Sequence, residues 1–206
     1  LSHITESVVN VTFPLYCKVK DDLKRVRRGY CTTIKFISMI TFPLMFGLCF
    51  VADDFILTVY GDKWVASIWP LRILCISGAL KSIFMVNDSL LRSQGRPELG
   101  FKWALFMLPL TIVSIIIASH WGIKGVAVAM SLLSAVSIII VAIGMRLIGG
   151  KLLDYLLSLR PAIVCSGVMV FLLSFLKLTP VMESLFSPVR LFTNIAFGLL
   201  FYVIIM

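Results

Sequence analysis

The sequence predicts an all-α membrane protein, a polytopic transmembrane helix bundle with about six full spans plus the tail of a preceding one. Composition is the first observation: 60% of the 206 residues are hydrophobic and 14% are charged, against about 45–50% and about 25% in soluble domains. The second is that the apolar residues form long continuous runs, unlike the short alternating segments of barrel strands. Since only helices and closed barrels satisfy every backbone hydrogen bond in lipid, these runs predict helices.

Seven apolar segments can be marked along the chain. The first is interpreted as the tail of a span, and the other six are each close to the roughly 20 residues that cross the hydrocarbon core. The segments cover residues 1–17, 34–52, 68–91, 103–119, 122–145, 158–177 and 189–206. We expect one membrane domain over residues 1–206. Because the chain begins at Leu1 and ends inside the apolar run "NIAFGLLFYVIIM", we also expect a fragment of a longer protein.

The third observation is that basic residues concentrate in alternate loops. Segments 18–35, 92–102 and 146–160 together hold 13 of the 19 lysines and arginines. Cytoplasmic loops carry such an excess, so we expect these three to be cytoplasmic. The net charge of +9 is then mostly a topology signal. We expect no nucleic-acid partner, because no soluble basic face with stacking aromatics is visible. The loop "KVKDDLKRVRRGY" either anchors to anionic lipid headgroups or faces a substrate.

Two charged residues interrupt the run over 68–91. Lys81 lies near its middle, roughly 15 Å from either end, whereas a lysine side chain reaches only about 6 Å. A charge facing lipid at that depth costs at least about 2.5–3.5 kcal/mol. Lys81 therefore either pairs with another helix or lines a cavity that accepts anions. Asp88, at i+7, shares its face. Asp88 lies four residues before Arg92, and a local i,i+4 ion pair between them is an adequate explanation for it.

The sequence shows neither the spacing of metal ligands nor a group of catalytic residues. The five cysteines are scattered, without metal-ligand spacing, and the two histidines are isolated. No nucleophile–base pair is visible. A membrane glycosyltransferase or polysaccharide polymerase would need a catalytic carboxylate array or a large external loop. We therefore expect no enzyme activity, no metal and no cofactor.

Four segments resemble a known family in order and spacing. They are "FPLYCKVKDDLKRVRRGY", "FPLMFGLCFVADDFILTVYGDKW", "LRILCISGALKSI…LLRSQGRPEL" and "HWGIKGVAVAMSL". Over most of residues 10–160, the chain resembles the C-terminal half of polysaccharide (O-antigen or exopolysaccharide) flippases. These form a branch of the multidrug/oligosaccharidyl-lipid/polysaccharide exporter superfamily.

The resemblance implies a bacterial inner-membrane transporter with two pseudo-symmetric helical lobes around a central cavity. Such proteins move undecaprenyl-diphosphate-linked sugar repeat units from the cytoplasmic to the periplasmic leaflet, by alternating access driven by an ion gradient. This chain would be most of the C-terminal lobe and would pack on the N-terminal lobe and on membrane lipids. Alternative functions are a cation-coupled multidrug exporter of the same superfamily and a non-catalytic membrane subunit of a polysaccharide export complex.

The resemblance also implies roles for particular residues. The family motif Phe-Pro-x-x-Ser-Arg matches at Phe13 and Pro14, whereas Cys17 replaces the serine and Lys18 the arginine. Lysine keeps the charge but loses the planar two-pronged donor. An anionic diphosphate crossing the membrane interior needs positive charge along its path. The expected path cations are Lys81 at mid-membrane, Arg72 at the periplasmic end and Lys18 at the cytoplasmic mouth, with Asp88 as a candidate for ion coupling.

Overall fold

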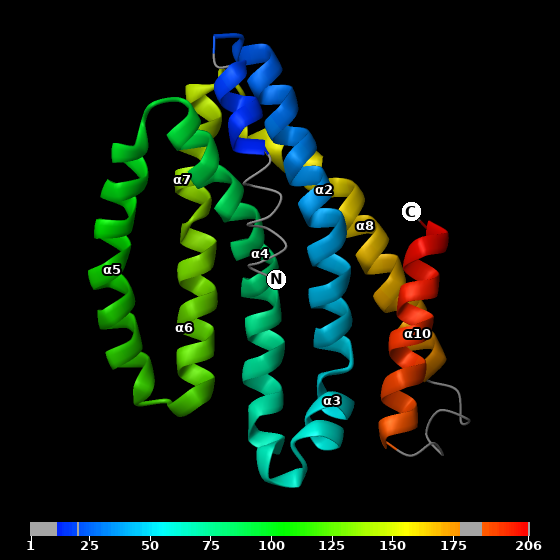
Figure 1. Ribbon diagram of the computed structural model, residues 1–206. Helices are drawn as coiled ribbons and strands as arrows, with labels where there is room; N and C mark the ends of the chain where they lie inside the picture. Colours follow the sequence, from blue (N-terminus) through cyan, green and yellow to red (C-terminus); the bar gives the residue numbers. More distant parts are fainter. Residues whose placement is uncertain (1–11, 20, 178–186, 206) are drawn as a thin grey trace.

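The computed structural model describes residues 12–19, 21–177 and 187–205, and these ranges hold helices and turns without any strand. A helical stretch over 12–18 comes first. The other elements, labelled in Figure 1, are α2 (Leu23–Phe50), α3 (Ala52–Val59), the 3-10 helix η1 (Asp62–Ser67), α4 (Ile68–Ser93), α5 (Pro97–Ser119), α6 (Gly122–Val136), α7 (Ile138–Leu147), α8 (Leu152–Lys177) and α10 (Ser187–Ile205).

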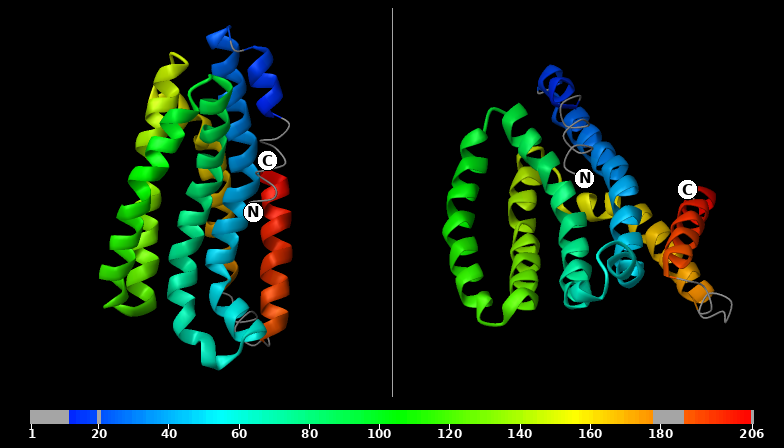
Figure 2. Two further views of the ribbon diagram at one scale, coloured as in Figure 1. Left: turned by 60° about the vertical axis from the view of Figure 1, so that its left-hand side comes forward. Right: turned by 60° about the horizontal axis from the view of Figure 1, so that its bottom comes forward.

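The helices form an up-and-down bundle around the pair α2 and α4 (Figure 1). This pair is antiparallel, because Tyr30 near the start of α2 reaches Asn87 near the end of α4. Figure 2 shows that α8 crosses α2 obliquely and that the α5–α6 hairpin stands on the opposite side, against α4. α10 packs on α8 and α3. Among the described residues, five helical segments are long and apolar enough to cross a membrane, and Val189–Tyr202 is a shorter apolar helix. The predicted polytopic all-α fold is confirmed.

The predicted basic loops are mostly helical ends. α2 begins at Leu23, where the Asp22 carboxylate accepts hydrogen bonds from the backbone N–H groups of Lys24 and Arg25, 3.1 Å each. Such an N-cap satisfies donors that a helix start leaves unpaired. The prediction of a loop over 18–35 is therefore wrong for most of its length, and Lys35 lies inside a spanning helix. The loops predicted over 92–102 and 146–160 are likewise mostly helical. Only residues 94–96 and 148–151 lie outside the helices there.

The start of α2, the α4–α5 turn and the α7–α8 turn lie at one end of the bundle, which we call the basic end (Figure 1). Arg27 on α2 donates a hydrogen bond to the Gly149 carbonyl in the α7–α8 turn, at 3.0 Å. Gly149 has φ +65°, a left-handed conformation in which glycine is favoured because it has no Cβ. The three basic segments, which alternate along the sequence, therefore lie at the same end of the bundle.

Two features of the helices differ from the sequence prediction. α3 and η1 fill the connection between the first two long helices, at the end opposite the basic end. The predicted span 122–145 is divided at Ser137 into α6 and α7. Of the segment expected to be the tail of a preceding span, residues 1–11 lie outside the described residues.

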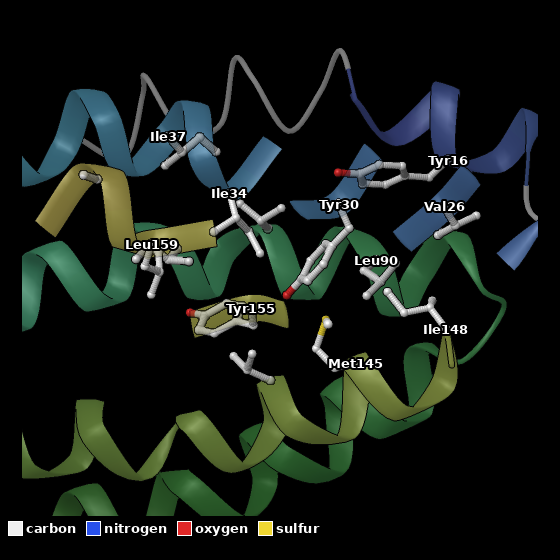
Figure 3. Packing of buried hydrophobic residues seen from close by; sticks show 14 of the residues in the cluster. Tyr16, Val26, Tyr30, Ile34, Ile37, Leu90, Met145, Ile148, Tyr155 and Leu159 are labelled. Atoms are coloured by element: carbon white, nitrogen blue, oxygen red, sulfur yellow. The ribbon is translucent and has the colours of Figure 1, made fainter. Parts of the chain in front are cut away.

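The buried core lies between α2, α4, α7 and α8, toward the basic end (Figure 3). Tyr30 from α2 points there toward Tyr155 from α8 and Met145 from α7, which are drawn beside each other. α5 is the opposite case, because Ala118 is its one buried residue and large apolar side chains cover the rest of its surface. In lipid, such a surface needs no protein cover, and helix association depends on close packing and polar contacts. α5 is therefore the least buried of the five candidate spanning helices within the described residues.

Candidate functional site

Lys81 lies on the exposed surface of α4, in the middle of a membrane-spanning helix. Lys81 lies thirteen residues after the start of α4 at Ile68 and twelve residues before its end at Ser93. Within the described part of the chain, no carboxylate forms an ion pair with it. The expectation that Lys81 either pairs with another helix or lines a cavity that accepts anions therefore stays a prediction.

Asp88 shares the exposed side of α4 with Lys81, as the i+7 spacing predicts. Its Oδ2 atom lies 2.6 Å from Arg92 Nη2, so the predicted local ion pair is confirmed. The pair is largely solvent-accessible, with 64% of the Arg92 side chain and 51% of the Asp88 side chain exposed. Exposed i,i+4 pairs are worth about 0.3–0.5 kcal/mol. Asp88 is consequently held only weakly and remains accessible.

Arg72 points to a different side of α4 from Lys81. The two residues are nine positions apart, which is about two and a half helical turns. Arg72 Nη2 contacts Asp53 Oδ2 at 2.5 Å, and each side chain is about one-third exposed. Arg72 is therefore already paired to a carboxylate of α3. Lys18 is exposed at the end of the 12–18 helical stretch. The three expected path cations thus do not gather on one surface of the described helices.

A second ion pair at the same end was not foreseen. Asp54, next to Asp53 in the first turn of α3, is buried with 1% of its side chain exposed. Its Oδ1 atom accepts a hydrogen bond from Arg190 Nε of α10 at 2.7 Å. Consecutive carboxylates therefore hold two different helices, α4 and α10. The sequence shows two acids at a helix start, but nothing in it indicates an arginine 136 positions later as a partner.

Asn87 forms a buried polar junction between three helices. The Tyr30 hydroxyl of α2 donates to Asn87 Oδ1 at 3.3 Å, and Asn87 Nδ2 donates to the Ile140 carbonyl of α7 at 3.2 Å. Asn87 is 2% exposed. Gly144 of α7 makes room for it, because a Cβ there would lie 2.2 Å from Oδ1. A buried amide is stable only when its polar atoms are bonded.

Among the described residues, a small apolar hollow lies between α2 and α4, and no metal cluster is present. A pocket between α2 and α4 has an empty volume of about 140 Å³. It is lined by Met45, Phe46, Cys49, Cys75, Ile76 and Ala79. Ligand pockets are usually about 300–1,000 Å³, so this one is too small for an oligosaccharide. Within the described ranges, no group of three or more His, Cys, Asp or Glu side chains is arranged to hold a metal ion.

These features define a multi-pass α-helical membrane protein with an accessible cation at mid-membrane. Residues 1–69 match the protein family described as "Polysaccharide biosynthesis protein". The chain is 32% identical to the teichuronic acid biosynthesis protein TuaB of Bacillus subtilis over 167 residues, which are 81% of this chain and 33% of TuaB. It is 30% identical to the lipopolysaccharide biosynthesis protein WzxC of Escherichia coli over 155 residues, 74% of this chain and 32% of WzxC. The chain spans about a third of the length of these curated relatives.

The fold is similar to that of the lipid II flippase MurJ in its inward closed conformation. The TM-score is 0.76 at 19% sequence identity, with 98% of this chain and 42% of MurJ covered. Together, these matches confirm the resemblance to polysaccharide flippases of the multidrug/oligosaccharidyl-lipid/polysaccharide exporter superfamily. The chain is that of a multi-pass bacterial membrane protein, and the comparisons favour a transporter over a catalyst.

Proposed function

We propose that this chain belongs to a flippase that moves undecaprenyl-diphosphate-linked oligosaccharide repeat units from the cytoplasmic to the periplasmic leaflet for cell-surface polysaccharide synthesis. The observation that carries the proposal is Lys81, an accessible mid-membrane cation without a carboxylate partner in the described helices, in a fold similar to that of a lipid flippase. Its relatives are named for teichuronic acid and lipopolysaccharide biosynthesis. The protein transports and is not an enzyme.

The chemistry of the substrate explains the cation. A diphosphate loses its hydration when it enters the membrane interior, and an unpaired anion is costly there. A lysine held at the same depth stabilises the anion, because charges interact more strongly at a low dielectric constant. A cationic drug would instead require acidic residues on the path, so the multidrug-exporter alternative is not favoured.

Arg72 and Lys18 act at the two ends of the route. The Asp53 carboxylate already occupies Arg72, at 2.5 Å, so an arriving phosphate must compete with it. That exchange lets Arg72 accept the headgroup and then release it. Since Lys81 and Arg72 lie on different sides of α4, the route also needs surfaces of the N-terminal lobe of the same protein. The sugar-bearing cavity then lies between the lobes, as in other transporters built from repeats.

The basic end of the bundle faces the cytoplasm, and the protein resides in the inner membrane. The clustering of 13 of 19 basic residues in three segments supports this orientation, as does the common end of these segments in Figure 1. Asp88 is the candidate for the coupling ion, because it is accessible on the Lys81 side and only weakly held by Arg92. Binding of a proton or a metal cation there would compete with that pair.

Complementation tests the proposal. The full-length gene carrying Lys81→Ala, Lys81→Arg or Lys124→Ala is placed in a host that lacks its own polysaccharide flippase. Surface polysaccharide and membrane protein level are measured together. Lys124 is the matched control, an exposed lysine near the start of α6. We expect Lys81→Ala to abolish export at normal protein level, while Lys81→Arg and Lys124→Ala support it. Failure of the wild-type gene to restore any surface polysaccharide would overturn the flippase assignment.

A further inference from the structure

We propose that Asn87 is a positioning residue, which fixes the rotation of α4 about its own axis and so keeps Lys81 on the open side of the helix. The expected effect of Asn87 on transport rests on the proposed function. The expected effect of Asn87 on the direction of the Lys81 side chain is independent of that function.

The Asn87 amide is anchored on two helices at once. Its oxygen accepts from the Tyr30 hydroxyl of α2 at 3.3 Å, and its nitrogen donates to the Ile140 carbonyl of α7 at 3.2 Å. The carbonyl of Ile140 can only accept, so the amide atom that bonds it is the nitrogen, and the oxygen is left to accept from Tyr30. A single bond would permit α4 to turn about it. Two bonds to different helices do not.

Steric fit adds to this anchoring. Gly144 lies against the amide so closely that a Cβ on it would meet Oδ1 at 2.2 Å and the amide carbon at 3.2 Å. The side chain is thus enclosed between the α7 backbone and Tyr30, both of which are fixed in the buried core. Tyr30 is fully buried, as are Val141 and Met145 on α7 (Figure 3 labels Tyr30 and Met145). A rotation of α4 would drive the amide into α7 or withdraw it into apolar surroundings without partners.

The helical geometry connects this anchor to Lys81. The two residues are six positions apart, so their side chains diverge by about 120° around α4. When Asn87 points into the core, Lys81 points outward, as its exposure shows. Ile83 lies on the core side and is fully buried. If α4 rotates, Lys81 turns away from the open side while Ile83 moves toward it.

A pair of cysteine positions measures that rotation. In the full-length protein with its native cysteines replaced, Lys81→Cys and Ile83→Cys are introduced separately, and their rates of modification by N-ethylmaleimide are compared in membranes. We expect position 81 to react faster than position 83. Asn87→Ala should lower the 81-to-83 rate ratio by at least about threefold, because the first rate falls while the second rises.

Four variants separate positioning from packing. Tyr30→Phe removes one bond and should lower the ratio partly. Asn87→Ala with Gly144→Ala fills the space of the amide without its hydrogen bonds and should still lower the ratio. Ser82→Ala is the matched control, because Ser82 is also buried on α4 and bonds to Thr41 of α2, but it has no bond to α7. It should leave both the ratio and polysaccharide export unchanged, whereas Asn87→Ala should reduce export at a normal protein level.

The proposal is overturned if Asn87→Ala and Tyr30→Phe leave the ratio unchanged. It is also overturned if both rates rise together, since that indicates loosening of the fold without rotation. If Asn87→Ala does not accumulate in the membrane, Tyr30→Phe is the deciding variant. A lowered 81-to-83 ratio then supports the proposal, and an unchanged ratio overturns it. If Lys81→Ala exports normally but Asn87→Ala still changes the ratio, the proposed function fails at Lys81 and the positioning of α4 stands.

Discussion

Asp53 and Arg72 join α3 to α4 through an ion pair whose Oδ2 and Nη2 atoms are 2.5 Å apart. The pair lies at the end of the bundle opposite the basic end, and about a third of each side chain is exposed. Such a partly exposed pair contributes little to stability, typically up to about 1 kcal/mol. The proposed exchange, in which an arriving phosphate displaces the carboxylate from Arg72, would therefore cost little free energy.

Replacing Asp53 and Arg72 separately shows whether their ion pair is only structural or is a site at which a phosphate takes the place of the carboxylate. Arg72→Ala removes the cation that we propose accepts the phosphate, so we expect polysaccharide export to fall. Asp53→Asn frees the cation, so export should continue. Either variant should change the free energy of unfolding by no more than about 1 kcal/mol. Equal loss of export in both variants would mean that the pair matters only for structure.

The neighbouring pair, Asp54 with Arg190, should behave in the opposite way. Asp54 is 1% exposed, and removal of one partner of a buried pair typically costs about 3–5 kcal/mol because a charge is left uncompensated. We expect Arg190→Ala to lower the thermal unfolding midpoint of the full-length protein in detergent markedly. Arg25→Ala is the control, since the Arg25–Asp22 pair is exposed, with 75% and 50% of the two side chains accessible. Similar midpoints for both variants would contradict this account of α10 docking.

Two glycines in the helices provide a matched test of the Asn87 junction. Gly144→Ala places a methyl group 2.2 Å from Asn87 Oδ1, whereas a Cβ at Gly167 in α8 meets no atom within 4 Å. Overpacking typically costs about 1–3 kcal/mol, while alanine in a helix interior gains roughly 0.5–1 kcal/mol over glycine. Gly144→Ala should therefore lower the unfolding midpoint and Gly167→Ala should keep or raise it. A midpoint for Gly144→Ala at or above that of the wild type would contradict the observed fit.

Asp88 provides a test of ion coupling. Its exposed pair with Arg92 contributes about 0.3–0.5 kcal/mol, so Asp88→Asn should leave stability almost unchanged. We expect the same variant to abolish stimulation of transport by an imposed ion gradient, because it removes the carboxylate that we propose binds the ion. Export is measured in membrane vesicles with and without the gradient. If the ion gradient stimulates transport by Asp88→Asn as fully as transport by the wild type, Asp88 has no part in ion coupling and only forms its ion pair with Arg92.

The sequence was sufficient for features that depend on local chemistry. The run over 68–91 predicts α4 within two residues, because a span of apolar side chains has a length set by the membrane. The i,i+4 ion pair of Asp88 and Arg92 follows from helix geometry alone. The start of α2 was placed too late, since hydropathy marks where a helix enters lipid. The helix itself begins at the Asp22 cap, outside the apolar run.

Features that depend on packing between distant segments were beyond sequence reasoning. Asn87 is visible as a polar residue in an apolar run, but its bonds to Tyr30 and to the Ile140 backbone require the arrangement of α2, α4 and α7. The pairing of Asp54 with Arg190 depends likewise on how α10 docks. Arg72 was expected at one end of α4, and its direction became clear only from the contact with Asp53.

The central claim is that Lys81 stabilises the anionic headgroup during translocation. It is tested most directly by flipping rates in proteoliposomes. Purified full-length wild-type, Lys81→Ala and Lys81→Arg proteins are reconstituted with a fluorescently labelled undecaprenyl-diphosphate-linked oligosaccharide from the native host. Movement between leaflets is followed by quenching from outside. We expect Lys81→Ala to slow flipping at least about tenfold, or about 1.4 kcal/mol in the barrier, while Lys81→Arg stays near the wild-type rate. Wild-type flipping by Lys81→Ala would contradict the account.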